Sequence, residues 1–195
     1  MTSHTDTPTI IDQLAARDHT PHLTPTTPAD HTAALNHTDP VARARTARDS
    51  RNPAELHTLA GDPSADVRIY TAGNPHATPA TLHMLAADLD PEVREAVAHN
   101  RATPTTTLTK LAADPDTNVR WGVATNPHTP TTTLTHIEHA DPDPDISYTT
   151  SHIRRNALAA HRATLTGPAR DHADLLLPTF TGWPDQLDHL LATLP

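Results

Sequence analysis

The chain has 195 residues, no cysteine and a formal net charge of −9. Leu, Ile, Val and Phe together contribute 33 residues, about 17% of the chain, which argues against an enzyme with a large, aromatic-rich core. The absence of cysteine excludes disulfides, thiolate-bound metal centres and a cysteine nucleophile, and the acidic charge argues against a general nucleic-acid binder.

The first 30 residues predict one short helix near Thr9–Asp18, followed by a Thr/Pro-rich extended linker. The opening segment MTSHTDTPTI lacks the basic and apolar parts of a secretory signal. No stretch approaches the roughly 20 apolar residues of a membrane span. The expected location is therefore the cytoplasm.

Residues 31–151 contain about five copies of a repeat. Asn74, Asn100 and Asn126 open matching segments spaced 26 residues apart, and a shorter copy begins at Asn52. A more degenerate copy precedes these, with Asp39-Pro40 and Arg45 in step. Each copy predicts two short helices.

The first helix of a copy begins at a Thr-Pro pair. Thr78, Thr103 and Thr129 are predicted N-caps, each followed by a proline at the first helical position. Leucines at i, i+3 spacing, such as Leu82 and Leu85, predict one apolar stripe along the helix.

An Asp-Pro turn separates the two helices, as in Asp114-Pro115-Asp116. The second helix carries valines at i, i+4, such as Val93 and Val97. An asparagine ends it in most copies, where a left-handed residue is tolerated. Such short helices cannot bury their stripes alone, so we expect the copies to stack into a solenoid.

The pattern N-P-x-x-T-P-x-x-x-L-x-x-L-A-x-D-P-D-x-x-V-R-x-x-V-A resembles the leucine-rich repeat variant family. Residues 74–99 and 100–125 match it closely, and 52–73 and 126–151 more loosely. The resemblance implies an all-α, ARM/HEAT-like fold: a right-handed superhelical solenoid of paired short helices (α plus 3₁₀, or α) with no sheet. Some members bind an iron–sulfur cluster through cysteines, which this chain lacks, so no cofactor is expected.

Residues 152–195 predict three further helices that cap the solenoid. Gly167-Pro168 closes the first helix, Pro178 ends the second and Trp183-Pro184 starts the third. This segment is richer in large apolar residues than the repeats. A dimerisation or docking segment is the alternative.

Arginine and aspartate recur at fixed places in successive copies, and stacking would align them. The structural interpretation is an Arg/Asp ladder between neighbouring copies, whereas the alternative is a row that binds phosphates or an acidic partner. The ladder residues are Arg45, Arg68, Arg94, Arg120, Asp62, Asp88 and Asp114.

The position after each ladder arginine varies between copies. Because it lies two residues beyond the core valine, we expect it to face solvent, where variation sets partner choice. Packing over the next copy is the alternative. The candidate interaction surface is Ile69, Tyr70, Glu95, Trp121 and Tyr148.

Other chemistry has weak support in the sequence. His136 and His139 could share zinc with one carboxylate, but such a pair is expected by chance among 16 histidines, so no metal site is predicted. Nucleophile-elbow, P-loop and dinucleotide-binding motifs are missing, so no catalytic residue is predicted and the chain is not expected to be an enzyme.

The predicted function is a non-catalytic repeat scaffold that binds another protein through its solenoid surface. The alternative is nucleic-acid backbone binding, or a DNA-glycosylase-like role, through Arg43, Arg45, Arg48, Arg51 and the ladder. A net charge of −9 makes nucleic acid the less favoured partner. A third hypothesis is that the chain is one module of a larger assembly.

Overall fold

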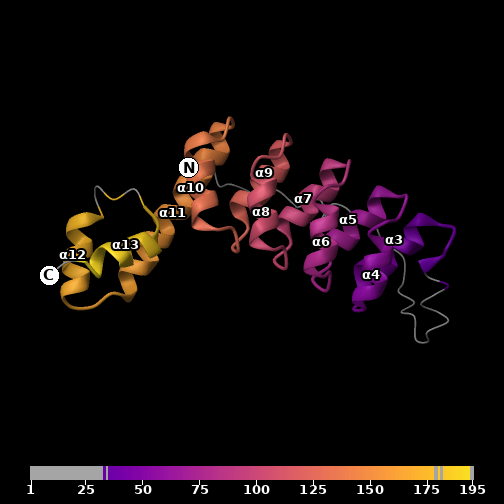
Figure 1. Ribbon diagram of the computed structural model, residues 1–195, viewed down its shortest axis with the longest axis horizontal. Helices are drawn as coiled ribbons and strands as arrows, with labels where there is room; N and C mark the ends of the chain where they lie inside the picture. Colours follow the sequence, from indigo (N-terminus) through magenta and orange to yellow (C-terminus); the bar gives the residue numbers. More distant parts are fainter. Residues whose placement is uncertain (1–32, 34, 178–179, 181, 194–195) are drawn as a thin grey trace, which may run out of the picture. The chain divides into compact units, whose positions relative to one another are not determined.

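The computed structural model describes residues 33, 35–177, 180 and 182–193 (Figure 1). The helix predicted near Thr9–Asp18 and the linker after it lie outside these residues. Within them every regular element is an α-helix and no strand is present, which confirms the all-α prediction. None of these helices is long and apolar enough to cross a membrane. The chain divides into two compact units, up to Thr129 and from Pro130.

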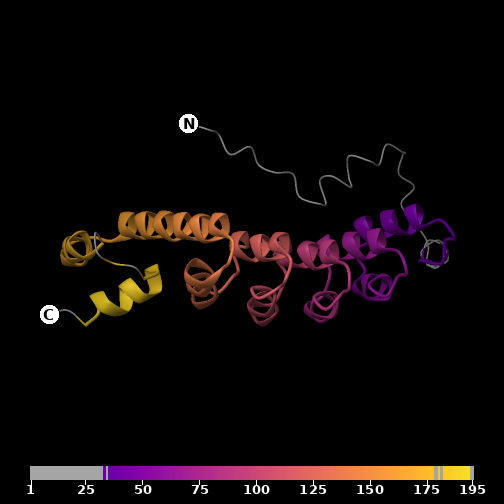
Figure 2. The ribbon, with the colours of Figure 1, turned by 90° about the horizontal axis from the view of Figure 1, so that it is seen from above.

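The first unit consists of helix pairs in two rows. One row holds the second helices, α3, α5, α7 and α9, each packed against the next, and the other holds the first helices, α4, α6 and α8 (Figure 2). Both helices of a pair are α-helical. Their bounds are α3 Pro40–Asp49, α4 Pro53–Leu59, α5 Ala65–Gly73, α6 Pro79–Leu85, α7 Pro91–His99, α8 Thr105–Leu111 and α9 Thr117–Thr125.

The buried stripes of the two rows form the core of this unit. The leucine pairs of the first helices and the valines of α5, α7 and α9 are almost fully buried, as the repeat pattern predicts, whereas Val41 of α3 is 51% exposed. A column of buried alanines near the ends of the second helices lets neighbouring helices approach closely. The column consists of Ala47, Ala72, Ala98 and Ala124.

At Gly122 the helix α9 lies close against α7. A Cβ at this position would lie 2.8 Å from the Ala98 Cβ and 3.0 Å from two ring atoms of His99. Real Cβ atoms are not found at such distances, so the packing of α9 on α7 requires glycine here.

The Thr-Pro pairs do not all cap their helices in the same way. Thr78 is the N-cap of α6 and accepts the Thr81 N–H, as predicted. In the next two copies the proline occupies the N-cap position, so Thr103 and Thr129 lie one residue earlier than predicted. Their buried hydroxyls instead donate to the carbonyl oxygens of the preceding second helix, at 2.6 Å in both copies.

A one-residue shift within the repeat explains this difference. The interval from the opening asparagine to the first buried leucine is the same in the copies that begin at Asn74 and Asn100. Ala77 therefore occupies the place of Thr103, because the Thr-Pro pair of the Asn100 copy begins five residues before its leucine and that of the Asn74 copy four residues before. The sequence prediction aligned the copies by their Thr-Pro pairs. In the structure, the residue that keeps the same place in each copy is the first buried leucine.

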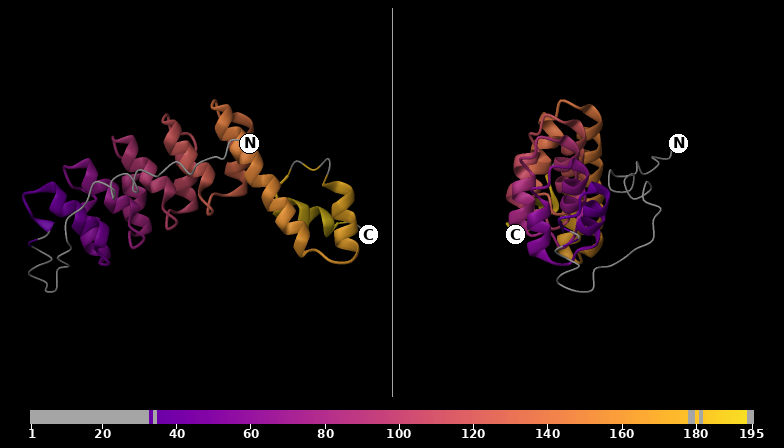
Figure 3. Two further views of the ribbon diagram at one scale, coloured as in Figure 1. Left: turned by 180° about the vertical axis from the view of Figure 1, so that it is seen from behind. Right: turned by 90° about the vertical axis from the view of Figure 1, so that its right-hand side faces the viewer.

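The second unit contains α10 (Thr131–Ala140), α11 (Pro144–Thr164), α12 (Pro168–Leu176) and α13 (Pro184–Leu191), with α10 packed on α11 (Figure 3). Gly167, with φ +58°, separates α11 from α12, and α13 begins after the buried Trp183. The domain boundary predicted at 151/152 falls inside α11. Leu158, Ala173 and Leu187 form a core in this unit. The cap or docking role of residues 152–195 stays a prediction.

Candidate functional site

A ladder of buried asparagine amides joins neighbouring copies. The Asn100 Nδ2 donates to the carbonyl oxygens of Ala72 (2.6 Å) and Asn74 (2.9 Å) at the end of the preceding second helix, α5. Asn126 repeats the arrangement on Ala98 (2.7 Å) and Asn100 (3.0 Å). Each Oδ1 also accepts the N–H two residues further on.

The reason expected for these asparagines is therefore wrong. Asn100 has φ −70° and ψ 125°, and Asn74 and Asn126 are within a few degrees of it, so all three are extended and not left-handed. Their role is to satisfy buried carbonyl groups across the repeat junction, and the two N–H donors of one amide nitrogen can satisfy two of these groups at once.

The Arg/Asp ladder runs through the opposite end of the second helices. Arg68 donates from Nε and Nη2 to the Asp88 carboxylate in the next copy, at 2.7 and 2.9 Å, and Arg94 contacts Asp114 in the same bidentate way. The remaining Nη1 of each arginine reaches carbonyl oxygens of the turn before its own helix. Arg120 is buried and makes the corresponding Nη1 contacts.

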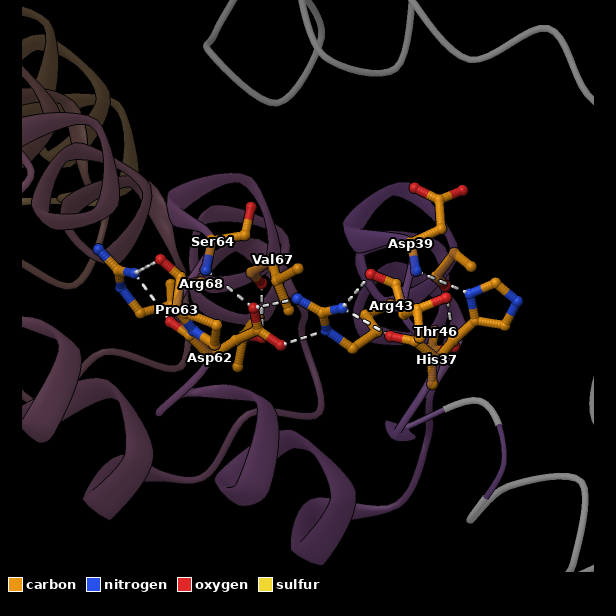
Figure 4. Close-up of polar contacts among 12 residues, drawn as sticks. His37, Asp39, Arg43, Thr46, Asp62, Pro63, Ser64, Val67 and Arg68 are labelled. Atoms are coloured by element: carbon orange, nitrogen blue, oxygen red, sulfur yellow. Dashed lines mark hydrogen bonds and ion pairs between the residues drawn. The ribbon is translucent and has the colours of Figure 1, made fainter.

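The first arginine of the ladder is Arg43, and the assignment of Arg45 is corrected. Arg43 donates to Asp62 at 2.6 and 2.9 Å (Figure 4). It lies four residues after the N-cap Asp39, which is the spacing that separates Arg68 and Arg94 from their N-caps. Arg45 is two residues further on, at a different place around the helix.

In the first copy, other residue types stand where later copies have the ladder aspartate and the ladder asparagine. His37 holds the position of a ladder aspartate, and its Nδ1 accepts the Asp39 N–H at 3.0 Å just as Asp62 accepts the Ser64 N–H at 2.9 Å. Ser50 ends α3 where an asparagine ends the later helices, and its hydroxyl accepts the Asn52 N–H. Both keep the local hydrogen bond.

Ionisation of the ladder aspartates is favoured in the folded chain. Burial opposes it, but hydrogen bonds from the arginines and from backbone N–H groups outweigh burial and lower the pKa of Asp62, Asp88 and Asp114. The guanidinium groups of Arg43, Arg68 and Arg94 are thus occupied by carboxylates within the chain, and the phosphate-binding alternative loses their support.

The structure separates the residues of the predicted interaction surface. Ile69 and Tyr70 are only 1% and 8% exposed, because α5 is packed between α3 and α7, so their predicted exposure is corrected. Tyr148 is 63% exposed and its ring meets the His152 ring edge-on in the second unit. Glu95 and Trp121 are half-buried.

Glu95, His99 and Trp121 lie at the junction of α7 and α9, where Gly122 brings the two helices together. The Nδ1 of His99 hydrogen-bonds the Glu95 carbonyl oxygen at 3.1 Å, and the His99 ring borders Gly122, the residue after Trp121. We call Glu92, Glu95, His99, Asp116 and Trp121 the Glu95 site. Only Glu95 and Trp121 belong to the predicted surface. His99 joins the site because the helices lie close together at Gly122. The repeat pattern does not predict this contact.

The electrostatics of the Glu95 site are one-sided. Burial raises the pKa of Glu95, and the carboxylates of Asp116 and Glu92 raise it further. Burial lowers the pKa of His99 despite its hydrogen bond to the Glu95 carbonyl oxygen, which favours a neutral ring. The site therefore contains three carboxyl groups and no cationic group among its members.

Glu138, the carboxylate between the two histidines near the end of α10, is engaged within the chain. Glu138 accepts hydrogen bonds from Arg154 at 2.8 and 2.9 Å and from Ser151 at 2.8 Å, and these lower its pKa against the effect of burial. Across the described part of the chain, no group of three or more His, Asp or Glu side chains is placed to hold a metal ion.

The repeat geometry agrees with the comparison with known families. Residues 91–116, which run from the start of α7 through α8 to the N-cap of α9, match the leucine rich repeat variant family. This segment is similar to the leucine rich repeat variant. No curated protein and no solved structure matched the chain. The leucine rich repeat variant is a non-catalytic helical repeat, so the match supports a scaffold.

Proposed function

We propose that this chain is a non-catalytic scaffold that binds a protein partner on the second-helix face of its repeats, at the Glu95 site. The single observation that carries the proposal is that Glu95 on α7 and Trp121 on α9 hold the same place in successive repeats and both remain half-buried, whereas Ile69 at that place on α5 is buried. A partly exposed tryptophan with a rigid backbone is a common anchor of protein interfaces. The family match supports the scaffold role.

A protein partner is supported over nucleic acid by the charge of this face. Phosphates would meet the carboxylates of Glu92, Glu95 and Asp116, which repel them. The first ladder arginines are engaged within the chain. The nucleic-acid alternative therefore lacks a specific observation in its favour.

Affinity capture with matched variants tests the proposal. The full chain and its Trp121→Ala variant are used as baits, and bound proteins are quantified by mass spectrometry. Met84→Ala is the control, because Met84 is an exposed apolar residue on the first-helix row. We expect Trp121→Ala to lose at least one protein that Met84→Ala retains. An identical set of captured proteins from all three baits would contradict the proposal.

A further inference from the structure

We propose that the N-terminal segment of this chain docks on the outer face of α3, where it takes the place of a preceding second helix. The segment is the helix predicted near Thr9–Asp18, which lies outside the described residues. This inference is independent of the function proposed above. It follows from the order of helices along the chain, from the residues that α3 presents and from charge.

One position of each second helix faces the helix before it. In α9 this position is Gly122, six residues after the N-cap, where a Cβ would lie 3.0 Å from the His99 ring of α7. The same position is Tyr70 in α5 and Ala96 in α7, and both side chains are buried, at 8% and 1% exposure. In α3 it is Arg45, which is half-buried. Because α3 is the first second helix in the described part of the chain, Arg45 faces the end of the row (Figure 2).

The outer face of α3 comprises Val41, Arg45 and Arg48. These residues are spaced i, i+4 and i+7 and therefore lie on one side of the helix. Val41 is 51% exposed and stands two residues after the N-cap. The later second helices have polar, exposed residues at that position: Asp66, Glu92, Asn118 and Asp145. The described copies thus have an apolar residue there only at the end of the row, where a covering helix would contact it.

The order of helices along the chain places the predicted helix at this face. Each of α4, α6 and α8 follows a second helix, and that second helix packs against the next one: α3 on α5, α5 on α7 and α7 on α9. Leu35, which is helical, follows Pro28 by seven residues, as Leu111 follows Pro104. Thr27-Pro28 therefore predicts the start of the first helix before α3. The helix near Thr9–Asp18 then has the place of a second helix that packs on α3.

The predicted helix has the chemistry that the outer face of α3 requires. Ile11, Leu14 and Asp18 are spaced i, i+3 and i+7, so one side of the helix carries two apolar residues and a carboxylate. Residues 1–32 contain four aspartates and one arginine, whereas residues 41–51 contain four arginines and one aspartate. The two segments therefore attract each other, and the apolar side of the helix can cover Val41.

The connection between the two helices permits this contact. Residues 19–38 span up to about 65 Å when extended, whereas the ten residues of α3 span about 15 Å. A second copy of the chain is the other occupant that the charges allow, because its acidic segment could bind in trans. The tether favours docking within one chain, since a linked segment is present at a high effective concentration. The docked segment then closes this end of the solenoid as a capping unit does.

Paramagnetic relaxation measured by NMR on the full chain tests the inference. The chain has no cysteine, so Gln13→Cys gives a single attachment site for a nitroxide label. We expect the amide signals of α3 to lose most of their intensity in the labelled chain, whereas those of α9 keep theirs. Adding Leu14→Lys should restore the α3 signals, because it places a cation against the arginines. The matched control is Ala16→Lys, which adds the same charge on the other side of the predicted helix and should leave the broadening unchanged.

Full intensity of the α3 signals in the labelled chain would overturn the inference. Equal broadening with Leu14→Lys and with Ala16→Lys would also overturn it, because the apolar side of the helix would then make no contact. A mixture of nitroxide-labelled chain and unlabelled, isotope-enriched chain separates the two occupants. Broadening of α3 in the enriched chain of that mixture would overturn docking within one chain in favour of a second copy.

Discussion

Replacing Asn100 by alanine removes one rung of the asparagine ladder. Asn100 is 7% exposed, and its side chain makes three hydrogen bonds: two donated to the carbonyl oxygens of Ala72 and Asn74, and one accepted from the Ala102 N–H. A typical hydrogen bond contributes about 1 kcal/mol net, and a buried group left without a partner costs about 1–3 kcal/mol. We therefore expect Asn100→Ala to lower the free energy of unfolding by about 3–5 kcal/mol.

Urea unfolding followed by circular dichroism measures this loss. Asn118→Ala is the control, because Asn118 is exposed in the first turn of α9, and we expect it to change the unfolding free energy by less than about 0.5 kcal/mol. A loss below about 1 kcal/mol for Asn100→Ala, or one equal to that of the control, would refute the reasoning. The buried carbonyl groups would then be satisfied without the amide.

Three further predictions follow from the packing and the ladders. Gly122→Ala should lower the unfolding free energy by about 1–3 kcal/mol in the same urea assay. Gly61→Ala should be close to neutral, because a Cβ at Gly61 would lie 3.6 Å from its nearest neighbouring atom. Because the folded chain lowers the pKa of Asp62, Asp88 and Asp114, their stabilisation is present above the unfolded value of about 4 and is lost as pH falls through the folded values. The urea midpoint should therefore drop between pH 5 and pH 2 by less in Asp88→Asn than in the parent, and equal drops would contradict the ladder. Leu187→Ala should lower the unfolding free energy of the second unit by about 2–5 kcal/mol. Amide hydrogen exchange should become faster in α11–α13 and stay unchanged in α3–α9. Faster exchange in both units would show that the second unit has no core of its own.

The helices and their core were predictable because the repeat period determines which residues face inward. Leu82 and Leu85 recur at the same spacing in each copy, and the Asp-Pro turns divide the helices wherever they occur. Arg43 was also within reach of the sequence, since counting four residues from the N-cap Asp39 identifies it. Counting from the repeat similarity alone led to Arg45.

The remaining features depend on partners one repeat away. The Asn100 amide bonds carbonyl oxygens 26 and 28 residues earlier, so a local pattern cannot reveal its role. Burial of Ile69 requires helices on both sides of α5, whereas a helical wheel considers one helix at a time. The Glu95 site was predicted only in part, because its second ring, His99, is placed by the close approach at Gly122.

The two ladders hold the α7–α9 junction at both ends. Arg94 binds Asp114 where the helices begin, and Asn126 binds the Ala98 and Asn100 carbonyl oxygens where they end. Glu95 and Trp121 come from different repeats, yet along their helices both lie between these two sets of hydrogen bonds. The helices are hydrogen-bonded to each other at both ends, so the residues of the proposed binding site are held in place before a partner arrives. A partner would therefore lose its own conformational freedom on binding, but would not have to order a loop of this protein.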